Sequence, residues 1–169
     1  IRTGLYDMIN NSTTSLDLLF SRSDLIWTIS TQGEAIQSAI ERGVKVRIMS
    51  EPPSGRDRLP KILRRRFSGD SEIPMKYIMN PTAFYIIADQ SQLMIITSGA
   101  HHLPSSICLW TNNESLVSLT RRNFDDNWHE SVHWKTIDGI TMSVSPQDDS
   151  EGSAARVHRL LLYQSQEVK

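Results

Sequence analysis

A helix, a glycine and a strand follow one another without a spacer in residues 31–50, and this order constrains the fold more than any other feature of the sequence. Thr31 can cap a helix with Glu34 three positions later, and apolar residues then recur at helical spacing up to Gly43. The next residues, VKVRIMS, alternate β-branched and basic residues as strands do. We therefore expect a helix from Thr31 and a strand over 44–50, an order typical of α/β units with parallel strands.

The other expected elements follow from apolar periodicity and turn residues. A helix over 4–11 precedes a short buried strand over 15–20. Further strands are expected over 75–79, 83–89, 92–98 and 106–111, the middle two forming a tight hairpin. Asn113 can cap a helix that runs to His133. Its apolar stripe is expected to contain Leu116, Leu119, Phe124, Trp128 and Val132. Together these elements predict an α/β fold with a mixed, largely parallel sheet flanked by helices.

Composition limits the class of protein. The 169 residues, 38% hydrophobic and 22% charged, suffice for one ordinary core. Their net charge of −1 gives no overall positive field for nucleic acid or anionic lipid. The single cysteine, Cys108, cannot form an internal disulfide and is expected to be an inert core thiol. Because no secretory or membrane-spanning run is present, we expect a cytoplasmic protein without a membrane partner. We also expect it to be part of a longer chain, since the sequence opens on Ile1 instead of Met.

His-Glu-x-x-His occurs at residues 129–133, the spacing with which zinc peptidases place two imidazoles and a general base on one helical face. A zinc peptidase also needs a third ligand. The usual extension requires glycine and histidine where this chain has Thr136 and Gly139. We therefore expect no metal or other cofactor, and we assign His129 and His133 to the end of a surface helix.

Three stretches together resemble the phospholipase D-like fold, in particular its non-catalytic versions. They are AIERGVKVRIMS, the hairpin TAFYIIADQSQLMIITSG, and FDDNW in the closing helix. Similar non-catalytic domains are the effector domains of archaeal TrmB-type transcription regulators and the input domains of archaeal sensor histidine kinases. The resemblance covers about residues 1–137. We interpret residues 1–140 as a degenerate phospholipase D-like domain and residues 141–169 as a linker and C-terminal helix leading into a missing segment.

Active members of this superfamily carry His-x-Lys-x4-Asp on the strand that enters the hairpin. In this register Thr82 stands at the histidine position, Phe84 at the lysine position, and only the aspartate persists, as Asp89. Threonine lacks a nitrogen of suitable basicity to attack phosphorus, and phenylalanine supplies no charge for phosphate. The resemblance therefore implies that the chain is not an enzyme, although the hairpin that would display the catalytic groups remains.

The strand ends near that hairpin are then expected to form a site for an uncharged or weakly polar ligand. The candidate ligand-binding residues are Thr82, Phe84, Asp89, Thr97, Ser98, His101 and His102. Each has a plainer interpretation. Thr82 and Phe84 can be packing residues, the two histidines can belong to a solvated loop, and the Asp89 carboxylate can accept backbone N–H bonds that fix the hairpin.

We accordingly expect a sensory or dimerisation domain of a TrmB-like regulator, forming a homodimer, with a small-molecule effector and with DNA contacted only through a missing domain. The alternatives are an input domain of a sensor histidine kinase and a residual phosphodiesterase using His101 or His102. The basic segment 56–66 can be a solvated helix face or can bind phosphate, DNA or an acidic partner.

Overall fold

The computed structural model describes residues 2–52, 74–97, 103 and 106–133. Its first half contains helix α1 (Arg2–Asn11), strand β1 (Ser15–Phe20), helix α2 (Arg22–Glu41) and strand β2 (Lys45–Ser50). Strands β3 (Met75–Tyr77), β4 (Phe84–Ala88), β5 (Gln92–Ile96) and β6 (Cys108–Thr111) follow, and then helix α4 (Glu114–Glu130) and strand β7 (Val132–His133). The basic segment 56–66 and residues 141–169 lie outside the described part of the chain, as does the expected domain boundary.

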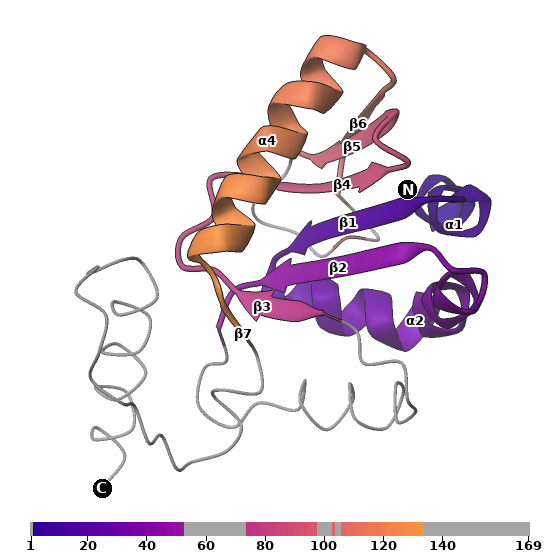
Figure 1. The fold of residues 1–169 in the computed structure, drawn as a ribbon. Helices are drawn as coiled ribbons and strands as arrows, with labels where there is room; N and C mark the ends of the chain where they lie inside the picture. Colours follow the sequence, from indigo (N-terminus) through magenta and orange to yellow (C-terminus); the bar gives the residue numbers. More distant parts are fainter. Residues whose placement is uncertain (1, 53–73, 98–102, 104–105, 134–169) are drawn as a thin grey trace, which may run out of the picture.

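One seven-stranded sheet, in the order β6-β5-β4-β1-β2-β3-β7, forms the centre of the fold (Figure 1). Parallel pairing joins β1 to β2 and β2 to β3, whereas β4, β5, β6 and β7 pair antiparallel with their neighbours. The α/β class and the mixed sheet are confirmed. Parallel pairing is, however, confined to β1, β2 and β3, because the hairpin β4–β5 adds its strands on one side and the short β7 adds one on the other.

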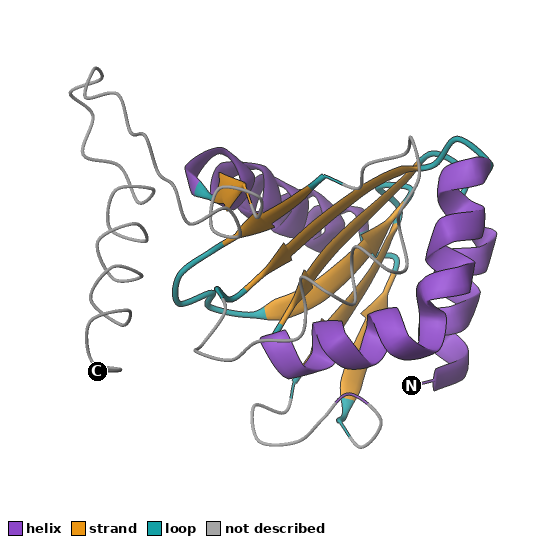
Figure 2. Ribbon diagram, turned by 90° about the horizontal axis from the view of Figure 1, so that it is seen from below, coloured by secondary structure: helices purple, strands orange, loops and turns teal. Residues whose placement is uncertain are grey.

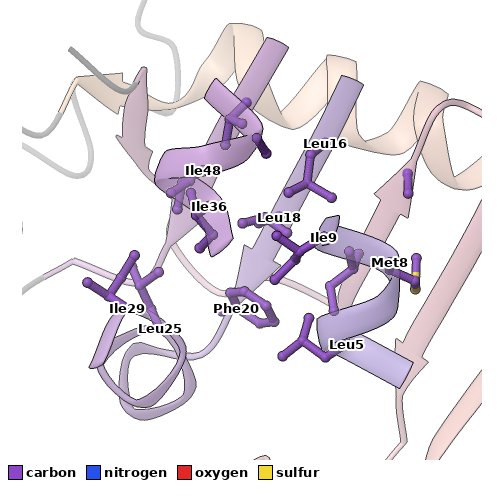
Figure 3. Close-up of a cluster of buried hydrophobic side chains, with 14 of the residues drawn as sticks. Leu5, Met8, Ile9, Leu16, Leu18, Phe20, Leu25, Ile29, Ile36 and Ile48 are labelled. Carbon is purple, nitrogen blue, oxygen red and sulfur yellow. The ribbon is translucent and has the colours of Figure 1, made fainter. Parts of the chain in front are cut away.

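Helices cover both faces of the sheet, with α1 and α2 on one face and α4 on the other (Figure 2). The larger apolar cluster joins α1 and α2 to the sheet (Figure 3). It includes Leu5, Ile9, Leu18, Leu25, Ile36 and Ile48, all fully buried. A smaller cluster under α4 contains Val117 and Phe124 together with Tyr85, Ile87 and Leu93 of the hairpin. None of the helices in the described ranges is long and apolar enough to cross a membrane.

Helix α2 begins much earlier than the sequence analysis predicted. It starts at Arg22, with Ser21 as its N-cap, instead of at Thr31. The Ser21 hydroxyl accepts the Asp24 backbone N–H at 3.2 Å and donates to the Asp24 carboxylate at 2.7 Å. Thr31 lies within the helix, where its hydroxyl donates to the Trp27 carbonyl at 2.9 Å. The Ser21-x-x-Asp24 spacing is a capping pattern that competes with the one at Thr31, and it is the one that caps the helix.

Helix α4 ends earlier than predicted, at Glu130, and residues Val132–His133 form β7 beside β3. Its buried stripe also differs, since Val117 and Phe124 are buried whereas Leu116 and Leu119 are 43% and 66% exposed. The helix contacts the sheet through Val117, Phe124 and the partly buried Trp128, so its buried stripe is displaced around the helix from Leu116 and Leu119. The first turns leave leucine side chains in solvent.

The hairpin β4–β5 confirms the expected turn. Asp89 and Gln90 have φ of 51° and 55°, and the Ser91 N–H donates to the Ala88 carbonyl at 3.1 Å. Two successive left-handed residues are the mark of the type I′ turn, whose twist matches that of the flanking strands. Aspartate tolerates this region better than most residues, which explains how the turn forms without glycine.

Candidate functional site at the carboxyl edge of the sheet

The carboxyl ends of the three parallel strands lie along one edge of the sheet, hereafter the carboxyl edge. It is formed by Phe20 of β1, Ser50 of β2 and Tyr77 of β3. Strand β4 runs antiparallel to β1, with Tyr85 opposite Leu19, so the start of β4 lies at the same edge. In open α/β sheets ligands bind outside the carboxyl ends of the strands. Polar side chains along the carboxyl edge are therefore candidates for a ligand site.

Thr82 and Phe84, which the resemblance aligns with the catalytic histidine and lysine of active members, both lie at the carboxyl edge. Thr82 is exposed two residues before β4. Phe84 is partly buried and packs against both hydrophobic clusters. An aromatic ring that links the two cores has a packing role and offers no charge to a phosphate.

A half-buried guanidinium and its partners add polar groups to the carboxyl edge. Arg22, the first residue of α2, donates from its backbone N–H to the Glu51 carboxylate at 3.3 Å and from its guanidinium to the Glu51 carbonyl at 3.1 Å. Burial lowers the pKa of Arg22, while Tyr77 and Glu51 act in the opposite direction by attracting the positive charge. The sequence alone did not point to the Arg22 guanidinium, because a helix that starts at Thr31 leaves residues 22–30 outside it.

Two buried hydroxyls near this edge have no hydrogen-bond partner within the described residues. They belong to Ser50, the last residue of β2, and Thr28 of α2, and both side chains are fully buried. Buried hydroxyls are satisfied in nearly all native structures. Their presence indicates that this part of the edge has hydrogen-bonding capacity that the described residues do not use.

Asp89 lies at the opposite end of β4 from Thr82 and Phe84, so the structure does not bring these three candidates together. Its carboxylate accepts hydrogen bonds from the backbone N–H groups of Thr13, Thr14 and Ser15 at 2.7–3.1 Å. Burial alone would raise the pKa of Asp89, but these N–H donors outweigh it and hold the pKa below its ordinary value. The aspartate joins the hairpin turn to the loop between α1 and β1.

The remaining candidates are divided between one described residue and three that are not. Thr97 is exposed at the end of β5, and its hydroxyl donates to the Ile107 carbonyl at 2.7 Å, which ties β5 to the segment before β6. Ser98, His101 and His102 lie outside the described residues.

The His-Glu-x-x-His motif does not form the helical arrangement that zinc peptidases use. His129 and Glu130 are exposed in the last turn of α4, whereas His133 lies in β7. The change from helix to strand at Ser131 ends the spacing of 3.6 residues per turn that would align both imidazoles. In the parts of the chain that the structure describes, no group of three or more histidine, cysteine, aspartate or glutamate residues could hold a metal ion.

A charged cluster under α4 was not foreseen from the sequence. Arg47 of β2 makes two hydrogen bonds, at 2.7 and 2.8 Å, with the buried carboxylate of Asp17 directly opposite on β1. It also pairs with Asp125 of α4 at 2.8 Å, and its guanidinium lies 4.8 Å from the centre of the Phe124 ring and 5.5 Å from that of Trp128. Hydrogen bonding to Asp17 raises the pKa of Arg47. A buried aspartate in the strand SLDLLF was the available signal, since a buried carboxylate requires a partner.

Tyr85 and Lys76 fasten α4 to the sheet on either side of this cluster. The Tyr85 hydroxyl donates to the Asn123 side chain at 2.8 Å, and burial raises the pKa of Tyr85. The Lys76 ammonium donates to the Trp128 carbonyl at 2.7 Å and lies 4.9 Å from the Trp128 ring centre. This face of the sheet is therefore held by polar contacts as well as by apolar packing.

No protein-family model and no curated protein matches the sequence. Solved structures do match. TrmBL2, an archaeal chromatin protein with a novel mode of DNA binding, is 14% identical in sequence to this chain, with a TM-score of 0.60. The match covers 77% of this chain and 49% of the TrmBL2 chain. The chain thus spans about half of TrmBL2. Nuc, a phospholipase D family member from Salmonella typhimurium, is 18% identical with a TM-score of 0.60, over 79% of this chain and 90% of its own. NucT from Helicobacter pylori is 13% identical with a TM-score of 0.58, over 78% and 89%. The chain therefore has a phospholipase D-like α/β fold.

Proposed function

We propose that the chain is a non-catalytic ligand-binding or dimerisation domain of a TrmB-like transcription regulator. The observation that carries this proposal is Phe84. In the register of active members it stands at the phosphate-binding lysine, and its ring packs against both hydrophobic clusters. Replacing a charge by a packed ring removes the attraction for a phosphodiester and at the same time stabilises the strand that once displayed the catalytic groups.

The polar groups at the carboxyl edge support a ligand-binding role. The buried Ser50 hydroxyl, the Arg22 guanidinium and the exposed Thr82 are hydrogen-bonding groups at or next to strand ends, and the buried Thr28 hydroxyl lies further along α2. A neutral polar ligand, such as a sugar or a nucleoside, fits such a set better than a highly charged one, because the Arg22 guanidinium already donates to the Glu51 carbonyl and is attracted by the nearby Glu51 carboxylate.

The likeness to TrmBL2 supports the regulator assignment. TrmBL2 is described as a DNA-binding chromatin protein, and this chain corresponds to about half of it. In our proposal DNA is contacted by a separate domain, because the chain itself has a net charge of −1. A winged-helix sequence in the adjacent coding region is expected, whereas a kinase core there would favour the histidine kinase input domain.

A thermal-shift screen with sugars, nucleosides and nucleotides tests the ligand-binding role. A ligand present at 100 times its Kd stabilises the folded state by about 2.7 kcal/mol, which raises Tm by roughly 5–10 °C for a chain of this size. The shift should disappear in Thr82→Trp, where a large side chain covers the carboxyl edge. It should persist in Ser118→Trp, a matched change at an exposed position of α4. If no compound raises Tm, or if Thr82→Trp leaves the shift unchanged, ligand binding at this edge is contradicted.

A further inference from the structure

Strand β6 ends the sheet and has no partner on its outer side among the described residues. Natural proteins usually protect such an edge with charged residues, prolines or bulges, because its free backbone groups can pair with another strand. Residues 107–113, ICLWTNN, contain neither a charge nor a proline. Within the described ranges, nothing therefore blocks pairing at this edge.

The ladder between β5 and β6 shows which backbone groups face outward. The Thr97 N–H donates to the Ile107 carbonyl at 2.9 Å, and the register places Leu109 opposite Ile95. Antiparallel ladders alternate, so Ile107 and Leu109 direct their N–H and C=O groups toward β5. Cys108 and Trp110 therefore direct theirs toward the open side.

Large apolar side chains gather at the same place. Ile107, Leu109 and Trp110 are 74%, 50% and 51% exposed. The first turns of α4 follow directly on β6 (Figure 1), and their Leu116 and Leu119 are 43% and 66% exposed. Single exposed leucines are ordinary, but five large apolar side chains within 107–119 make this end of the sheet a candidate interaction surface, with Trp110 on the opposite face of β6 from Ile107 and Leu109 because side chains alternate along a strand. We call these five residues the β6 patch.

We infer that the β6 patch is the surface through which two copies of this chain pair, β6 against β6 in antiparallel orientation, to form one continuous sheet. If the twofold axis passes through Leu109, the outward-facing backbone N–H and C=O groups of Cys108 and Trp110 can all bond to the partner subunit. Each Cys108 then lies opposite the partner subunit's Trp110, and each such pair can exchange two backbone hydrogen bonds. Leu109 lies opposite the partner's Leu109, on the face of the sheet that carries α4.

Charge and area favour a second copy as the occupant. In a twofold dimer the same surface of each copy meets itself, so the surface must be complementary to its own copy. Strand β6 carries no charge, so two copies of it do not repel each other. An acidic or nucleic-acid partner would find no cation in residues 107–113. The exposed parts of the β6 patch amount to on the order of 500 Å² per copy. Full burial of these parts in both copies would remove about 1,000 Å² from solvent, the lower limit for a specific interface, so we expect a weak dimer. The inference rests on the dimerisation part of the proposed function and assigns it to a surface.

Sedimentation velocity between 1 and about 200 µM, the range over which a micromolar dimer forms, tests the pairing. The wild-type chain should shift from monomer to dimer. Leu109→Lys should weaken the dimer at least tenfold, because it places two ammonium groups opposite each other at the axis. Ser38→Lys, an exposed change on α2, should have no effect. Circular dichroism should show unchanged secondary structure for both, since Leu109 is already half exposed.

A cross-link gives a second test that does not depend on weakening the dimer. In a Cys108→Ser background, Leu109→Cys should form an intermolecular disulfide on mild oxidation, because facing residues at the twofold axis have Cβ atoms close enough for one. Ser118→Cys in the same background should not. A dimer that Leu109→Lys leaves intact, together with no cross-link, places dimerisation on another surface and overturns this inference alone. A chain that stays monomeric at all concentrations removes the dimerisation role as well, while the thermal-shift screen still decides ligand binding.

Discussion

Replacing Arg47 by methionine should destabilise the domain more than any other single change at a charged residue that we consider. Arg47 holds the Asp17 carboxylate through two hydrogen bonds of 2.7 and 2.8 Å, and the Asp17 side chain is only 4% exposed. Methionine keeps much of the apolar stem of arginine and removes the charge. The Asp17 carboxylate would then remain buried in the sheet without its partner.

The size of the effect follows from the burial of each contact. Removing one partner of a buried ion pair costs about 3–5 kcal/mol, because the other charge is left unpaired. The contact with Asp125, which is 37% exposed, contributes less than about 1 kcal/mol. The two ring contacts, with Phe124 and Trp128, contribute about 0.5–1 kcal/mol each. Since these terms are not additive, we expect Arg47→Met to lower the free energy of unfolding by about 4 kcal/mol, a large share of the roughly 5–15 kcal/mol typical of a domain.

Urea unfolding followed by tryptophan fluorescence and circular dichroism measures this change. Asp125→Asn, the exposed partner, should cost less than about 1 kcal/mol. The double variant Asp17→Asn, Arg47→Met should recover a substantial part of the loss, because no unpaired charge remains. The reasoning is contradicted if the free energy of unfolding of Arg47→Met lies within about 1 kcal/mol of the wild-type value. It is also contradicted if the double variant is no more stable than Arg47→Met alone.

Three further outcomes are expected. Asp89→Asn keeps a residue that tolerates the left-handed turn but loses the charged acceptor, so it should cost about 1–3 kcal/mol at pH 7. The pKa of Asp89 is lowered in the folded state, so that cost should be constant above the unfolded pKa of about 3.9 and should shrink as the pH falls through the folded-state pKa. Urea titrations from pH 7 to about pH 3 measure this change. Ser21→Ala removes the cap of α2 and should lower the free energy of unfolding by about 0.5–2 kcal/mol in the same assay, whereas Ser118→Ala should be neutral. Burial raises the pKa of the Cys108 thiol, so iodoacetamide should label it more slowly at pH 7.5 in the folded chain than in urea, and equal rates would contradict this.

Local patterns in the sequence were sufficient for most of the elements. The glycine at Gly43, the hairpin around Asp89 and the Asn113 cap each have a short-range cause, and each is found where the sequence places it. The placement of Thr82 and Phe84 at one edge of the sheet followed from the register of the hairpin and agrees with the structure.

What could not be predicted depends on contacts between distant segments. The end of α4 at Glu130 results from pairing of β7 with β3, more than 50 residues earlier in the chain. The exposure of Leu116, next to the buried Val117, depends on which side of α4 faces the sheet, which the apolar pattern alone did not decide. Asp89 was assigned to a pocket or to its own turn, but its partners are the N–H groups of 13–15, which β1 brings beside it.

The start of α2 was missed for a different reason. Two capping patterns compete in this region, one at Ser21 and one at Thr31, and propensity does not rank them. Burial does, because Leu25 and Ile29 are fully buried when the helix begins at Arg22. Arg22 then comes to lie at the carboxyl edge, and the polar groups of the candidate site are incomplete without it.

The central claim, that Phe84 replaces the phosphate-binding lysine in a domain that does no chemistry, is tested most directly by measuring hydrolysis of bis-p-nitrophenyl phosphate by the purified chain. We predict no turnover above the buffer rate at any pH from 5 to 9. Turnover by the wild type that is lost when His101 and His102 are both changed to alanine would contradict the claim and establish a phosphodiesterase instead.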